Sequence, residues 1–149
     1  MMSGQRTAPD GLTTVTPYLC VADTGRLTAF LETAFDARPI HTEMDSEGRI
    51  RHAQYQIGNA MIYLGLAAGD FTPAPGALYV YVTDADATFA AALSAGATPL
   101  YPPGDTDYGN REGGVLDPAG VSWFIAHLLN GHEKGHGQER GQEPELEQG

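Results

Sequence analysis

The sequence predicts an α+β fold made of two tandem βαβββ modules. The first observation is an internal repeat at an offset of 61 residues, in which Tyr18-Leu-Cys-Val-Ala-Asp23 matches Tyr79-Val-Tyr-Val-Thr-Asp84. Each copy is a β-branched and aromatic run that ends on an acidic residue. An apolar stripe with helical spacing follows each copy, and alternating strand-like segments follow each stripe. A duplicated unit of this kind predicts two similar modules that share a buried surface, and the seam between them is a natural ligand site.

The first module is predicted over residues 14–66. Asp23 or Thr24 can cap its helix, because a short polar side chain accepts from the free backbone N–H groups of the first turn. Pro39 prevents the helix from continuing. The helical stripe consists of Leu27, Phe30, Leu31, Ala34 and Phe35. The expected strands are Thr14–Val21, Arg38–Met44, Arg49–Ile57 and Ala60–Leu66, with turns at Asp45–Gly48 and Gly58-Asn59.

The second module is predicted over residues 77–129, after a Pro- and Gly-rich linker at 67–76. Its helix is expected from Asp84 to about Ala95, with Gly96 suited to the position after the helix. The expected strands are Ala77–Val82, Thr98–Tyr101, Arg111–Leu116 and Val121–Leu128, with a loop at Pro102–Asn110 and a turn at Asp117–Gly120.

Composition indicates one domain, residues 14–129, between a flexible arm at 1–13 and a disordered acidic tail at 130–149. A chain of 149 residues with 42% hydrophobic content can bury one sizeable core. The net charge of −11 excludes nucleic acid and anionic membranes as partners and favours cationic ligands, although it also serves solubility. No apolar run of membrane-spanning length and no secretory signal is present, so we expect a cytoplasmic protein.

Two segments late in the chain carry a family resemblance. They are Tyr108-Gly-Asn-Arg-Glu-Gly-Gly-Val115 and Asp117-Pro-Ala-Gly-Val-Ser-Trp123. Together with the tandem βαβββ plan, they resemble the vicinal oxygen chelate superfamily of glyoxalase I, fosfomycin- and bleomycin-resistance proteins and extradiol dioxygenases. The match is best to the bleomycin-resistance-type or small glyoxalase-like subgroup. The resemblance implies a curved mixed sheet around a cavity, and a homodimer.

The resemblance also implies where a divalent metal would bind in metal-dependent members. The ligands there are a His at the start of each module's first strand and a Glu on each module's last strand. In this sequence the corresponding positions are Thr16, Ala77, Phe124 and either Ile62 or Tyr63. Shifting the alignment by one residue does not restore a donor set. We therefore predict no metal and no cofactor.

Other polar residues offer alternatives to that missing site. His52, Gln54 and Gln56 alternate along one strand and so share a face, as His41 and Glu43 do on the strand before. Such a face is either a solvated sheet surface, an atypical metal site or part of the cavity lining. In the last case His52 is the candidate general base. A metal-dependent lyase, isomerase or dioxygenase with atypical ligands is therefore the alternative function.

The predicted function is metal-independent binding of a small molecule. Aromatic side chains on strands and rim loops suit a planar ligand, and the acidic surface suits a positive charge on it. The structural alternatives are that most of these rings are core, and that Arg111 pairs with a loop carboxylate. We expect sequestration of an aromatic or cationic ligand such as an antibiotic, with antibiotic resistance as the biological outcome. The candidate ligand-binding residues are Tyr63, Tyr79, Tyr108, Arg111, Trp123, Phe124, His52 and Gln54.

Overall fold

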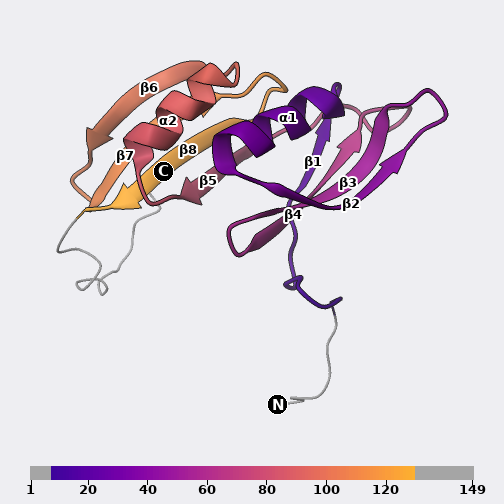
Figure 1. Ribbon diagram of the computed structural model, residues 1–149, viewed down its shortest axis with the longest axis horizontal. Coiled ribbons are helices and arrows are strands. Elements are labelled where there is room, and N and C mark those ends of the chain that lie inside the picture. Colours follow the sequence, from indigo (N-terminus) through magenta and orange to yellow (C-terminus); the bar gives the residue numbers. More distant parts are fainter. Residues whose placement is uncertain (1–7, 130–149) are drawn as a thin grey trace, which may run out of the picture.

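The computed structural model describes residues 8–129, so the predicted tail and most of the predicted arm lie outside the described residues. The described chain contains eight strands and two helices in the predicted order βαβββ–βαβββ (Figure 1). The first module comprises β1 (Tyr18–Val21), α1 (Thr24–Phe35), β2 (Arg38–Met44), β3 (Ile50–Ile57) and β4 (Ala60–Leu66). The second comprises β5 (Ala77–Tyr81), α2 (Ala85–Ser94), β6 (Thr98–Asp105), β7 (Asn110–Leu116) and β8 (Ser122–Leu128).

Each module forms its own four-stranded mixed sheet, and the two sheets have the same topology. The strand orders are β1-β4-β3-β2 and β5-β8-β7-β6. In each sheet the first strand pairs in parallel with the last, and the other neighbours are antiparallel. The duplication predicted from the sequence repeat is thus confirmed at the level of strand order and pairing.

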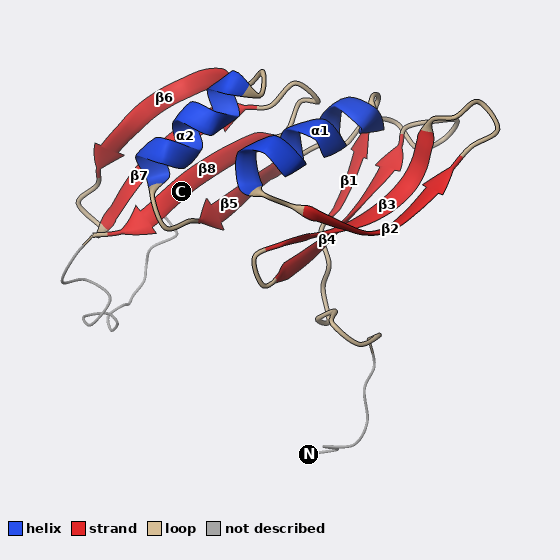
Figure 2. Cartoon of the chain, in the orientation of Figure 1, coloured by secondary structure: helices blue, strands red, loops and turns tan. Residues whose placement is uncertain are grey.

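Both helices cover the same side of the two sheets (Figure 2). Asp23 caps α1 by accepting from the Arg26 backbone N–H, and Asp84 caps α2 in the same way from Ala87. The Phe35 ring at the end of α1 packs against Trp123 of β8, with ring centroids 4.6 Å apart. One continuous core therefore joins the modules beneath the helices. Neither helix in residues 8–129 has the length and apolar character needed to cross a membrane.

Two strands differ from the sequence prediction by more than one residue. β1 begins at Tyr18 rather than Thr14, because Pro17 has no backbone N–H to continue the ladder. β6 continues to Asp105 through the segment predicted as a loop. Proline is tolerated in β6 because the strand lies at the edge of its sheet and carries register shifts on both sides of Tyr101.

The side of each sheet that faces away from the helices is open. The two sheets are not closed into a barrel, and large side chains such as Tyr18, Tyr79 and Tyr81 are about half exposed or more. Within residues 8–129, the predicted cavity is therefore represented by two open sheet faces rather than by an enclosed space.

Candidate functional site

The open face of the second sheet carries a row of aromatic residues, one strand after another. Tyr79 of β5 is paired with Phe124 of β8, Phe124 with Gly114 of β7, and Gly114 with Tyr101 of β6. The Phe124 ring lies 6.1 Å from the Tyr79 ring and stacks at 6.5 Å on the Tyr101 ring. Because paired residues project to the same side of a sheet, this register places the three rings side by side on the face away from the helices.

Glu112 lies at the centre of this face, two residues before Gly114 on β7. Tyr79 donates to its Oε1 at 2.5 Å, Tyr108 donates to the same oxygen at 2.7 Å, and Tyr101 donates to Oε2. These hydroxyls come from β5, from β6 and from the turn between β6 and β7. The Glu112 side chain is only 7% exposed, although it lies on the open face, because the tyrosines cover it.

Asn110 fixes the direction of this hydrogen-bond network. Its Nδ2 donates to the hydroxyl oxygens of Tyr79, at 2.8 Å, and Tyr81, at 3.3 Å. Since the Tyr79 oxygen accepts from Asn110, its proton points to Glu112. We call Tyr79, Tyr101, Tyr108, Asn110 and Glu112 together the Glu112 cluster.

The tyrosines of the Glu112 cluster hold their protons more strongly than free tyrosine does. Burial raises the pKa of Tyr108 to about 12, and its hydrogen bond to the Glu112 carboxylate adds to the effect. The same two causes, burial first, raise the pKa values of Tyr79 and Tyr101 even further. All three therefore stay neutral hydrogen-bond donors near neutral pH.

Gly114 makes room for the Tyr101 ring. A Cβ atom at this position would lie 2.5 Å from Tyr101 Cε1, which no side chain can accept without movement. Glycine is therefore required here by close approach of a ring, and the backbone at Gly114 does not have a positive φ. The first sheet has the same kind of close contact between a glycine and a tyrosine, because a Cβ at Gly65 would collide with the Tyr18 hydroxyl.

The strand registers identify His52 as the counterpart of Glu112. In the first sheet His52 is paired with Gly65, and Gln54 with Tyr63. In the second sheet Glu112 is paired with Ala126, and Gly114 with Phe124. Each residue neighbours the tyrosine of its module's first strand, since Tyr18 Oη lies 3.5 Å from His52 Nδ1.

The predicted residues of the first sheet form a second, smaller aromatic group. The rings of Tyr18, His52 and Tyr63 lie with centroids 5.4 to 6.1 Å apart. Gln54 donates to the Met61 sulfur on the neighbouring strand. His41 and Glu43, 3.2 Å apart, form an exposed pair on the neighbouring strand β2, in register with Gln54 and His52, and Glu43 is also bonded to Arg51. The structure therefore gathers His52, Tyr63 and Gln54 on one face, but not into the Glu112 cluster.

Two predicted ligand-binding residues lie elsewhere. Trp123 is 2% exposed on the helix side of β8, where its Nε1 donates to Asp117 at 2.8 Å. It belongs to the core, because strand alternation turns it away from its neighbour Phe124. Arg111 is likewise on the helix side of β7 and pairs with Asp86 and Asp105. The alternative prediction, that Arg111 pairs with a carboxylate, is the one that the structure confirms.

The candidate ligand-binding residues predicted from the sequence did not include Glu112, Tyr101 or Asn110. The signal that would have found Glu112 is the repeat itself. When the repeat is extended to the third strand of each module, His52 aligns with Glu112. The offset between these two residues is 60, one fewer than the offset of 61 between the first strands.

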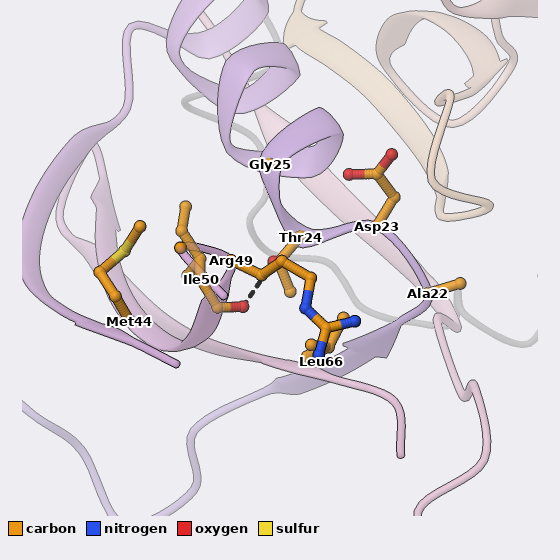
Figure 3. A pocket seen from close by; sticks show the side chains of 9 residues that line it. Ala22, Asp23, Thr24, Gly25, Met44, Arg49, Ile50 and Leu66 are labelled. Atoms are coloured by element: carbon orange, nitrogen blue, oxygen red, sulfur yellow. Dashed lines mark hydrogen bonds between the residues drawn. The ribbon is translucent and has the colours of Figure 1, made fainter. Parts of the chain in front are cut away.

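A separate depression of about 530 Å³ lies where α1 begins, against the β2–β3 turn (Figure 3). It is lined by Ala22, Asp23, Thr24, Gly25, Met44, Gly48, Arg49, Ile50 and Leu66. Two of these residues are hydrogen-bonded to each other, because the Thr24 hydroxyl donates to the Ile50 carbonyl at 2.6 Å. The polar groups here are already used, Asp23 for the helix cap and Arg49 in a bond to Asp45. The depression is distant in sequence and topology from the Glu112 cluster.

The donor set does not fit the divalent metal that the family resemblance implies. The positions corresponding to the chelating residues hold side chains such as Ala77 and Phe124, which offer no electron pair, and Tyr63, which is a poor neutral ligand. Across residues 8–129, no three His, Cys, Asp or Glu side chains are gathered as a metal would require. Glu112 is the one carboxylate of its cluster, and its partners are phenols. Metal independence itself stays a prediction.

Comparisons with known proteins agree on one family. Residues 11–125 match the family model described as "Glyoxalase/Bleomycin resistance protein/Dioxygenase superfamily". The uncharacterized protein Mb0911c of Mycobacterium bovis is 32% identical over 122 residues, which cover 74% of this chain and 80% of that protein. The uncharacterized protein Rv0887c of Mycobacterium tuberculosis is also 32% identical, with 72% of its length covered.

Solved structures show the same fold. TioX from Micromonospora sp. ML1 superposes with a TM-score of 0.66 at 24% identity, covering 78% of this chain and 99% of that one. A glyoxalase-related enzyme from Fulvimarina pelagi gives 0.63 at 22% identity, covering 78% and 88%. The fosfomycin resistance protein FosX from Mesorhizobium loti gives 0.59 at 18% identity, covering 86% and 100%. At these identities the likeness concerns the fold alone.

Proposed function

We propose that this chain, which belongs to the Glyoxalase/Bleomycin resistance protein/Dioxygenase superfamily, binds and sequesters an aromatic, cationic small molecule on the open face of its second sheet. The observation that carries the proposal is the Glu112 carboxylate, enclosed by three tyrosine hydroxyls beneath half-exposed aromatic rings. A buried negative charge behind stacked rings attracts a planar cation more than a neutral or anionic molecule.

The chemistry of the site favours binding over catalysis. A general base must reach the substrate, whereas both oxygens of Glu112 already accept hydrogen bonds from tyrosines and the residue is only 7% exposed. A general acid must release a proton, whereas the tyrosines have raised pKa values. Sequestration needs neither step. An antibiotic with a planar cationic ring system would be one ligand of the proposed class; the fosfomycin resistance protein FosX shares only the fold.

The test is a fluorescence or calorimetric titration with 10-methylacridinium, a planar aromatic cation, and with 9-anthracenecarboxylate, a planar aromatic anion. We expect the cation to bind and Glu112→Gln to weaken it about tenfold, which corresponds to about 1.4 kcal/mol. Tyr55→Phe is the matched control, because it removes a tyrosine–carboxylate bond, to Glu32, on the helix side of the other sheet. Equal binding of both compounds, or of neither, would contradict the proposal.

We also propose that two copies of the chain pair. The open faces expose large aromatic side chains, including Tyr18 at 54% and Tyr81 at 61%, and exposed apolar patches mark interaction surfaces. Sedimentation velocity measures the mass directly. A monomer over the whole micromolar range would refute the pairing without affecting the ligand proposal.

A further inference from the structure

The Glu112 carboxylate has little capacity left for a ligand. A carboxylate has about four acceptor positions. Oε1 accepts from Tyr79 and Tyr108, Oε2 accepts from Tyr101, and the side chain is 7% exposed. The strongest acceptor of the site is thus engaged within the protein and covered by it. A ligand that approaches the open face therefore meets a carboxylate that is covered and has about one acceptor position left.

The same tyrosines that hide Glu112 leave their rings open. Tyr79 is 45% exposed and Tyr108 is 54% exposed, although both hydroxyls are directed inward to the carboxylate. Tyr81 stands beside Tyr79 with ring centroids 5.3 Å apart, and the Tyr101 ring lies over Gly114 and beside Phe124. The surface presented to a ligand is therefore made of aromatic rings rather than of oxygen atoms.

The negative charge of Glu112 reaches this surface through the phenols. A phenol that donates to a carboxylate gains electron density on its oxygen and ring, because hydrogen bonds in a network polarise one another. The ring faces attract a cation through their quadrupole, and this added density strengthens the attraction. Glu112 consequently acts as a positioning and polarising residue that does not touch the ligand.

We propose that the cation recognised here carries no N–H group: it is a quaternary ammonium or an N-alkylated aromatic ring. This inference rests on the function proposed above and specifies its ligand. A primary ammonium has three donors that give up water on binding, and the carboxylate able to replace that water is covered and already accepts from three tyrosines. A fully alkylated cation has no donors to satisfy and presents methyl groups to the rings, as in aromatic cages for quaternary ammonium ligands.

The experiment compares benzyltrimethylammonium with benzylammonium at neutral pH, where both carry one positive charge. Tyrosine ring resonances of the full chain are followed by NMR during each titration. We expect benzyltrimethylammonium to bind about tenfold more tightly. Equal affinities, or tighter binding of benzylammonium, overturn this inference but leave the proposed function standing if 10-methylacridinium still binds. Failure of all three cations overturns both.

Two variants test the cause of the selectivity. Tyr108→Phe keeps the ring but frees one acceptor position on Glu112, so benzylammonium gains and the affinity ratio falls to about threefold or less. Tyr55→Phe, the matched loss of a tyrosine–carboxylate bond outside the site, leaves the ratio at about tenfold. If Tyr108→Phe keeps a native circular dichroism spectrum and an unchanged affinity ratio, the occupied carboxylate is not the reason for the selectivity between the two ammonium compounds.

Discussion

Gly114→Ala tests whether close packing of the Tyr101 ring holds the Glu112 cluster together. The new Cβ would lie 2.5 Å from Tyr101 Cε1 and 3.0 Å from Cδ1, so the ring must swing away from β7. Tyr101 lies on the edge strand and is 36% exposed, so the ring can move outward rather than into other atoms. It then loses both its hydrogen bond to Glu112 and its stacking on Phe124.

The expected cost follows from those two losses. A hydrogen bond to a charged group contributes about 1.5–3 kcal/mol, and water replaces part of it at a side chain as exposed as Tyr101. The aromatic pair contributes about 0.5–1.5 kcal/mol. Replacing glycine by alanine returns about 0.4–1 kcal/mol through the unfolded state, because the backbone at Gly114 does not have a positive φ. The net loss is about 1–2 kcal/mol, or a Tm lower by roughly 3–8 °C.

Gly104→Ala is the matched control for this experiment. Gly104 lies on β6 with nothing within 4 Å of the place where a Cβ would be, and its φ is not positive. The control should leave the free energy of unfolding unchanged or raise it slightly. Thermal and urea denaturation followed by circular dichroism measure both variants. If Gly114→Ala is as stable as Gly104→Ala and binds 10-methylacridinium as the wild type does, the argument that Tyr101 packing organises the site is wrong.

Three further predictions concern the fold and the titration of the site. Asp117→Ala removes the acceptor of Trp123 and of two backbone N–H groups, so it should lower the free energy of unfolding by about 3 kcal/mol or more in urea denaturation. Asp117→Asn should lower it by about half as much, and equal losses would contradict the role of Asp117 as this acceptor. Asp84→Ala removes the cap of α2 and should cost about 1 kcal/mol in the same assay, and no loss would show that the cap is not needed. Burial and then the hydrogen bond to Glu112 raise the pKa of Tyr108 to about 12. The stability that the neutral phenol contributes is therefore complete below about pH 10 and is lost as pH rises through about 12. A free energy of unfolding that stays constant over that range, or tyrosinate absorbance that appears fully by about pH 10, would contradict this prediction.

The sequence predicted the module plan because that plan is written in local patterns. The two helices are predicted by the spacing of apolar residues and by an aspartate that caps the first turn. The structure has both caps, at Asp23 and Asp84. The end of β6 was not predictable by the same reasoning. Pro102 and Pro103 are loop signals taken alone, and only the position of β6 at a sheet edge, with its irregular register, makes them compatible with a strand.

The site was only partly predictable, because side-chain direction in a strand depends on register. Tyr79 and Phe124 were expected at the site, and they do share a face, since they are paired across β5 and β8. Trp123, one residue from Phe124, points to the other face for the same reason. The hydroxyls that meet at Glu112 come from residues up to 33 positions away from it in the chain, and no local pattern indicates that they converge.

The duplicated geometry explains why one position became the centre of the site. The same place on the third strand of each module holds His52 in one sheet and Glu112 in the other, each next to a first-strand tyrosine. Around His52 lie the Tyr18 and Tyr63 rings and, paired with it across β2 and β3, the partly exposed Glu43. Around Glu112, the turn supplies Tyr108, the edge strand supplies Tyr101, and Gly114 allows that ring to approach. Within residues 8–129, the two halves therefore differ at equivalent points, and the enclosed carboxylate on which the proposed binding of a cation depends lies in the second.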